Sequence, residues 1–266
     1  MRWWLPLALV VVGGVAWTLW PKDSLPKDGV PGEGGPRDEL PGAGPPTREP
    51  AESLREDLAA GIALFESGDR AGARAHFESL LRTDPGDAAA AIQLAAIATA
   101  DRRFEDAEAT LRKVLEIDAE NAEAWTSLGT LLLLLEKGPE AAKCFETAIA
   151  ADARYAPARF YYGQMLEGAG LLAKARPEYE WARRIDPETP YYGLVEARVL
   201  WKSYQPTLAR TLLAQIDRGK TRPLTPEEDK LRREILEDLE IWPEGPPPDM
   251  LPPDPEDIVD EQPDGS

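Results

Sequence analysis

Residues 122–148 read AEAWTSLGTLLLLLEKGPEAAKCFETA, and this stretch decides the fold. Apolar residues recur in it every three to four positions, which is typical of helices that bury one face. Gly138 and Pro139 interrupt this pattern and predict a turn between two helices. The stretch therefore predicts a helical hairpin, in which the small residues Gly129 and Ala141 let the two helices approach each other closely.

The same pattern recurs every 34 residues, which predicts repeats at 54–87, 88–121, 122–155 and 156–189 and a degenerate one at 190–223. In each repeat the eighth position is small, the twentieth is alanine and the twenty-fourth is large and apolar. The eighth positions are Gly61, Ala95, Gly129, Gly163 and Ala197. The twentieth positions are Ala73, Ala107, Ala141, Ala175 and Ala209. The twenty-fourth positions are Phe77, Leu111, Phe145, Tyr179 and Leu213. One hairpin cannot bury both of its faces, so we expect neighbouring hairpins to stack.

The repeated positions, with Trp125, Leu128 and the closing Asp84-Pro85 and Asp186-Pro187, resemble the tetratricopeptide repeat (TPR) family. The resemblance covers about 170 residues, although repeats two and three lack the closing Asp-Pro. It implies an all-α fold, a right-handed α-solenoid of tandem helix hairpins occupying residues 51–223. For function it implies only the binding of some protein partner.

Several residues predict where helices begin or are disturbed. Asp87 and Thr189 are placed as N-caps, and Pro190 as a first-turn residue. Thr225 and Glu228 form a predicted capping box, which opens a helix through Ile241. We therefore expect residues 224–242 to form a C-terminal capping helix that seals the last repeat. Pro177 is expected to kink or shorten the second helix of repeat four.

Two proline-rich segments flank the predicted repeats. Residues 21–50 hold eight prolines and six glycines without apolar periodicity, so we expect a disordered linker. Residues 243–266 hold eight prolines and eight acidic residues without a basic one, and we expect a disordered acidic tail.

The N-terminal residues 1–20 contain an uncharged run from Trp3 to Trp20. Eighteen helical residues span about 27 Å, close to the thickness of a bilayer core. We interpret the run as a single-pass anchor in the inner membrane, and Arg2 favours an orientation with the repeats on the periplasmic side. The alternative is a cleaved signal peptide with Gly14-Val15-Ala16 as its site. That site is poor because Trp17, Leu19 and Trp20 follow it.

The composition excludes several functional classes. A net charge of −18 argues against binding to nucleic acid. With a single histidine, His76, and a single cysteine, Cys144, the sequence offers no metal site, and both residues are expected to lie peripherally on second helices. Gly219-Lys220-Thr221 resembles the end of a phosphate-binding loop but lacks the leading glycine and the strand. We therefore expect no cofactor, no metal and no enzymatic activity.

With catalytic and metal sites excluded, we expect the function to be binding at the protein surface. In the TPR family the first helix of each repeat lines a concave groove, and we expect a protein or peptide partner there. The predicted groove residues are Leu58, Ile62, Phe65, Ile92, Gln93, Thr126, Thr130, Leu133, Phe160, Tyr161, Gln164, Tyr191, Leu194, Arg198 and Trp201. Alternatively, flanking helices cover Leu58, Phe65, Leu194 and Trp201.

The sequence thus predicts a non-enzymatic, membrane-tethered scaffold that holds a partner during assembly of a cell-envelope complex. One alternative is a subunit that presents clients, as in cytochrome c maturation. A second is a self-regulated solenoid whose proline-rich tail occupies the groove. A third is a solenoid that binds a lipid or a small ligand.

Overall fold

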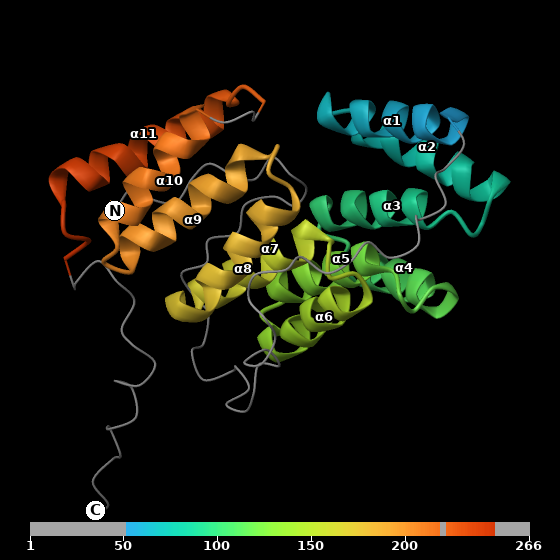
Figure 1. The fold of residues 1–266 in the computed structure, drawn as a ribbon. Helices are drawn as coiled ribbons and strands as arrows, with labels where there is room; N and C mark the ends of the chain where they lie inside the picture. Colours follow the sequence, from blue (N-terminus) through green and yellow to red (C-terminus); the bar gives the residue numbers. More distant parts are fainter. Residues whose placement is uncertain (1–51, 219–221, 248–266) are drawn as a thin grey trace, which may run out of the picture. The chain divides into compact units, whose positions relative to one another are not determined.

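The protein is described here from a computed structural model, which describes residues 52–218 and 222–247. Over these ranges the chain forms eleven α-helices and no strand (Figure 1). The predicted all-α class of tandem helix hairpins with a C-terminal capping helix is therefore confirmed. The described residues divide into two compact units, which meet between Arg154 and Tyr155.

The first unit consists of three helical hairpins. Its helices are α1 (Glu52–Glu66), α2 (Arg70–Thr83), α3 (Ala88–Ala100), α4 (Phe104–Ile117), α5 (Ala122–Leu134) and α6 (Gly138–Ala151). Within a hairpin α1 packs on α2, α3 on α4 and α5 on α6, and between hairpins α3 also contacts α1 and α5. The first helices therefore stack directly on one another.

The second unit has two hairpins and a closing helix. Its helices are α7 (Ala156–Gly168), α8 (Leu172–Ile185), α9 (Pro190–Lys202), α10 (Pro206–Arg218) and α11 (Pro226–Ile241). α11 packs on both α9 and α10, where a further hairpin would otherwise stack. The predicted capping box is present, because the side chain of Thr225 accepts from the Glu228 amide and the Glu228 carboxylate accepts from the Thr225 amide.

Side-chain caps start several of the other helices. Asp87 accepts from the amide of Ala90 at the start of α3, as predicted, and Asn121 does the same for Ala124 at α5. Thr189 stands at the N-cap of α9, but its hydroxyl donates to Asp186 instead of accepting from the helix. The proline at the first position of α9 leaves one amide fewer to satisfy there.

The turn inside every hairpin has the same backbone geometry. The residue two positions after each first helix has a positive φ: Gly68 (90°), Arg102 (61°), Glu136 (59°), Gly170 (80°) and Tyr204 (58°). The amide of the following residue then donates to the carbonyl five residues earlier, as from Lys137 to Leu132 and from Leu171 to Leu166. This is a Schellman ending, and it sets the direction in which each second helix returns.

Pro177 lies inside α8 without shortening it, so the expected shortening is wrong. α8 has 14 residues, as many as α4 and α6. Pro177 is exposed and withholds one amide from the carbonyl of Ala173, which is itself an exposed residue. Water can therefore satisfy that carbonyl. Gly138 and Pro139 also differ from expectation, because they form the first turn of α6 and not the turn before it.

The core of each hairpin is a contact between its eighth and twenty-fourth positions. A Cβ added to Gly129 would lie 2.8 Å from the ring of Phe145, and one added to Gly163 would lie 2.9 Å from the ring of Tyr179. Where the eighth position is alanine, the twenty-fourth is leucine. These pairs are Ala95 with Leu111 and Ala197 with Leu213, and all four residues are buried. A larger residue at the eighth position is thus compensated by a smaller one at the twenty-fourth position.

No helix within the described ranges is both long and apolar enough to cross a membrane. The predicted anchor 1–20, the linker 21–50 and most of the tail 243–266 lie outside those ranges.

We expect Gly129→Ala to lower the free energy of unfolding by about 1–3 kcal/mol, because the added methyl group overpacks a buried ring. Adding Phe145→Leu should recover part of this loss, since it recreates the alanine–leucine pairs of repeats two and five. Urea unfolding followed by circular dichroism measures both, with the exposed Gly86→Ala as control. Equal losses in the single and the double variant would contradict the size compensation.

Candidate functional site

The predicted groove residues of the first unit separate by position within the repeat. Ile92 and Thr126, at the fifth position, are buried, and so is Leu133 at the twelfth. Gln93 and Thr130, at positions six and nine, are half-buried. In the first repeat Leu58, Ile62 and Phe65 are partly buried and pack against the cluster around Phe77.

The second unit repeats this division. Phe160, Leu194 and Trp201 are buried, at the same fifth and twelfth positions. Tyr161, Gln164, Tyr191 and Arg198 are half-buried. We call these four residues, which lie on α7 and α9, the Tyr161–Arg198 face.

Six of the predicted groove residues therefore do not offer a free surface: Ile92, Thr126, Leu133, Phe160, Leu194 and Trp201. The alternative that other elements cover Leu194 and Trp201 is confirmed, because α11 packs on α9 and the indole of Trp201 donates to the carbonyl of Trp242 at 3.2 Å. The physical reason is that the fifth and twelfth positions lie on the side of the first helix that packs inside its own unit, which we call the seam. Phe160 contacts Tyr191 of α9, for example, and Trp201 contacts Trp242 after α11.

The two tyrosines of the Tyr161–Arg198 face pack against the buried ring of Phe160. The ring of the buried Phe160 lies 5.3 Å from that of Tyr161, 5.4 Å from that of Tyr191 and 5.3 Å from that of Tyr192, centroid to centroid. Edge-to-face contacts of this kind hold rings in fixed orientations. The two tyrosines of the face are therefore positioned before any partner arrives.

The hydroxyl groups of Tyr161 and Tyr191 can form hydrogen bonds with a partner. Burial raises the pKa of both, so each keeps its proton at neutral pH and can donate. Neither hydroxyl has a hydrogen-bond partner among the residues that the structure describes. The Tyr161–Arg198 face thus combines the apolar surface of two aromatic rings with hydroxyl groups that can form hydrogen bonds.

An ionic cluster lies beside this face. The carboxylate of Glu167 accepts from the hydroxyl of Tyr179 at 2.9 Å, from the ammonium of Lys202 at 2.7 Å and from Arg198 at 3.4 Å. Burial alone would raise the pKa of Glu167, but the charges of Arg198 and Lys202 and the two short hydrogen bonds lower it to about 2. Arg198 is therefore both held in place and neutralised.

Reasoning from sequence missed Glu167 and Lys202. A signal was present, because Glu167 is a carboxylate at a twelfth position, where the other repeats carry Phe65, Thr99, Leu133 and Trp201. A charge at a seam position needs a partner, and the cations one repeat later, at positions nine and thirteen, supply it.

The other candidates for chemistry are structural. Cys144 is 6% exposed, and burial raises its pKa to about 11, so the expectation that it lies peripherally is wrong. Among the neighbouring charges, Arg112 lowers this pKa, and Glu140 and Glu108 raise it further. His76 is half-buried and not freely solvated, since its Nε2 lies 2.7 Å from the carbonyl of Asp57. The described residues contain no group of histidine, cysteine or acidic side chains that could hold a metal, and residues 219–221 lie outside them.

We expect Glu167→Gln to lower the free energy of unfolding at pH 7 by about 1–3 kcal/mol, because Arg198 and Lys202 lose their counter-charge. The folded-state pKa lies below the unfolded value of about 4.5, so this contribution is full above pH 4.5 and disappears as the pH falls toward 2. Urea unfolding of the native chain and the variant from pH 7 to pH 2.5 measures it. The exposed Glu188→Gln serves as control, and a difference that persists unchanged at pH 2.5 would contradict the assignment.

Comparisons with known proteins agree with the hairpin architecture. Two tetratricopeptide repeat family models match the chain, over residues 64–131 and 126–190. Cellulose synthase operon protein C of Pseudomonas fluorescens (strain SBW25) is 31% identical over 164 residues, which are 57% of this chain but only 13% of that much longer protein.

Solved structures share the fold at low sequence identity. A thermophilic TPR protein of Thermus thermophilus is 19% identical, with a TM-score of 0.56, covering 69% of this chain and 97% of its own. PilF of Pseudomonas aeruginosa is 20% identical, with a TM-score of 0.54, covering 72% and 93%. Over residues 64–190 the chain therefore belongs to the tetratricopeptide repeat family.

Proposed function

We propose that this chain is a non-enzymatic scaffold that holds a protein or peptide partner on the Tyr161–Arg198 face. TPR proteins bind protein or peptide partners. The observation that carries this particular assignment is the pair of prepositioned tyrosines, whose hydroxyls have no hydrogen-bond partner within residues 52–218 and 222–247. Rigid aromatic side chains lose little conformational entropy on binding, which makes them effective anchors in interfaces.

The chemistry of the face defines the partner further. Because Glu167 already neutralises Arg198, the face does not attract an acidic segment strongly. Gln164 and the two tyrosines offer hydrogen bonds beside apolar rings. The partner is therefore a segment with apolar side chains and free backbone carbonyls, such as an extended strand or one face of a helix.

The location belongs to the same proposal. The uncharged run Trp3–Trp20 anchors the chain in the inner membrane, and residues 21–50 tether the repeats on the periplasmic side. The relative from Pseudomonas fluorescens bears the name of a cellulose synthase operon, and a role for this chain in assembling a cell-envelope complex accords with that name. The presentation of clients, as in cytochrome c maturation, is a narrower version of this role.

Self-regulation by the C-terminal tail is a second candidate, and one observation favours it. The described start of the tail packs on the turn that follows α9: Gly245 lies against the ring of Tyr204, and Pro246 is buried. If the tail competes with the partner, deleting residues 248–266 should raise partner affinity, whereas unchanged affinity would contradict competition.

We expect Tyr161→Ala combined with Gln164→Ala to reduce capture of the partner at least about tenfold, because these residues form the centre of the face. Capture is measured by crosslinking in membranes and mass spectrometry, with helicity checked by circular dichroism. Lys174→Ala, an exposed change on α8, is the matched control. Unchanged capture by a folded double variant would contradict the assignment of the face.

The membrane topology has its own test. A reporter that is active only in the periplasm, inserted after residue 50 of the full chain, should be active, because Arg2 favours retention of the N-terminus in the cytoplasm. Activity of a cytoplasmic reporter at the same site would reverse the orientation.

A further inference from the structure

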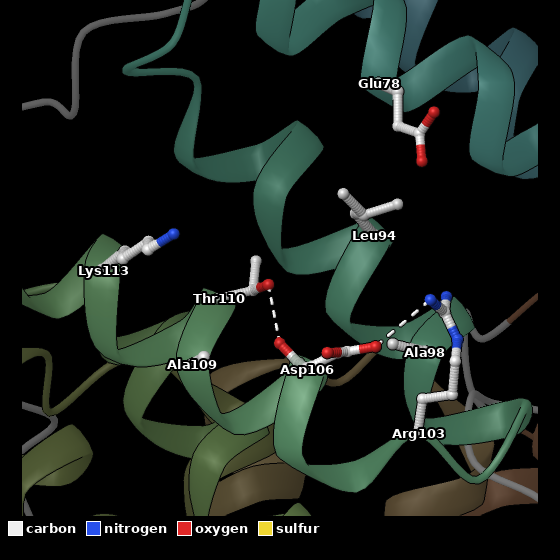
Figure 2. Close-up of a pocket in the computed structure, with 8 residues that line it drawn as sticks. All are labelled: Glu78, Leu94, Ala98, Arg103, Asp106, Ala109, Thr110 and Lys113. Carbon is white, nitrogen blue, oxygen red and sulfur yellow. Dashed lines mark hydrogen bonds and ion pairs between the residues drawn. The ribbon is translucent and has the colours of Figure 1, made fainter.

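A cavity opens on the surface of the first unit where α2, α3 and α4 meet (Figure 2). Its volume is about 260 Å³. Leu94, Ala98 and Ala109 form the apolar part of its lining, and the other lining residues are polar or charged: Glu78, Arg103, Asp106, Thr110 and Lys113. Glu78 of α2 and Lys113 of α4 stand on opposite sides of Leu94 (Figure 2). Within the described part of the chain neither of these two charges has an ion-pair partner.

The cavity exists because one leucine is missing. The eleventh position is leucine in every repeat but the second: Leu64, Ala98, Leu132, Leu166 and Leu200. Ala109 is also small where the third repeat carries Lys143. A buried position that lacks the side chain of its equivalents leaves apolar atoms without contacts, which destabilises a fold unless another group fills the space. A leucine side chain from outside the hairpin would have the right size.

The first unit begins with α1, which packs on α2 and does not line the cavity. α1 begins at Glu52, and the carbonyl of Asp57, in its second turn, contacts His76. His76 and Glu78 are two residues apart on α2 and therefore face nearly opposite sides of it. The first turns of α1 thus lie across α2 from the cavity, at a distance of at least about one helix diameter. A residue twelve positions before Glu52 can reach about 40 Å when the chain is extended, which is ample.

The linker contains a segment that fits. Its only leucines, Leu25 and Leu40, occur in the same pattern, Lys22-Asp-Ser-Leu25-Pro and Arg37-Asp-Glu-Leu40-Pro. A following proline favours the polyproline II conformation, which has three residues per turn. Arg37 and Leu40 would then lie on the same side, about 9 Å apart. Leu40 can enter the cavity while Arg37 meets Glu78 and the neighbouring acidic residues face Lys113.

We propose that residues 37–41 of this chain dock in the cavity, with Leu40 in the place of the missing leucine. The linker is then fixed at Leu40, and only residues 21–36 remain as a tether; this consequence, unlike the docking, rests on the proposed membrane anchor. Because the segment belongs to the same chain, its effective concentration is in the millimolar range. Half occupancy then requires about −4 kcal/mol of binding free energy, which Leu40 supplies together with the ion pair of Arg37.

Disulfide trapping in the full chain in detergent tests the docking. The pair Leu40→Cys and Ala109→Cys should form a disulfide at least about tenfold faster than the pair Leu40→Cys and Ala75→Cys. Ala75 is the matched control, because it is the equivalent exposed alanine one repeat earlier. Cys144 interferes little, since it is buried and its pKa is about 11.

A second test of the docking fills the cavity with a leucine of the hairpin itself. Ala98→Leu should slow trapping at Ala109→Cys to the control rate. Leu40→Ala should lower the Tm by roughly 2–4 °C in the native background and leave it unchanged in the Ala98→Leu background.

Three results would overturn the proposal. These are equal trapping rates at the two alanines, fast trapping that survives Ala98→Leu, and a disulfide that forms mainly between two chains and so places a second copy in the cavity. None of these readouts involves the partner, so their failure leaves the Tyr161–Arg198 face untouched.

Discussion

The contact between a small residue on the first helix and a large one on the second governs the rest of this structure. Gly129 meets the ring of Phe145 so closely that a single methyl group would overlap it. Alanine takes the place of glycine only where leucine replaces the ring, at Ala95 with Leu111 and Ala197 with Leu213. This rule fixes the distance between helix axes in each hairpin, and equal hairpins can then stack in register.

Stacking decides which residues remain for function. Most residues at the fifth and twelfth positions of the first helices are buried, so Phe160 and Trp201 contribute to stability. Positions two, six and nine stay partly accessible, and in the second unit they carry Tyr161, Tyr191 and Arg198. A repeat protein therefore acquires a specific surface by varying a few positions while the seam keeps the fold.

The sequence was sufficient to predict what repeats along the chain. The 34-residue frame, the cap at Asp87 and the capping box at Thr225 follow from local chemistry and were confirmed. The errors arose where the outcome depends on the neighbouring hairpin. Cys144 is buried although its position was expected to be peripheral, and Glu167 is tolerated because Arg198 and Lys202 come from the next repeat. One sequence without its stacking geometry does not reveal such pairings.

Hydrogen exchange of the purified chain, resolved along the sequence, tests the central claim most directly. The account requires slow exchange that recurs every 34 residues, centred on the eighth and twenty-fourth positions from Gly61 to Leu213. The carbonyl-bonded turn amides of Lys137 and Leu171 should share this protection. Exchange that is uniformly fast, or protected without that recurrence, would contradict an architecture built on paired small and large residues.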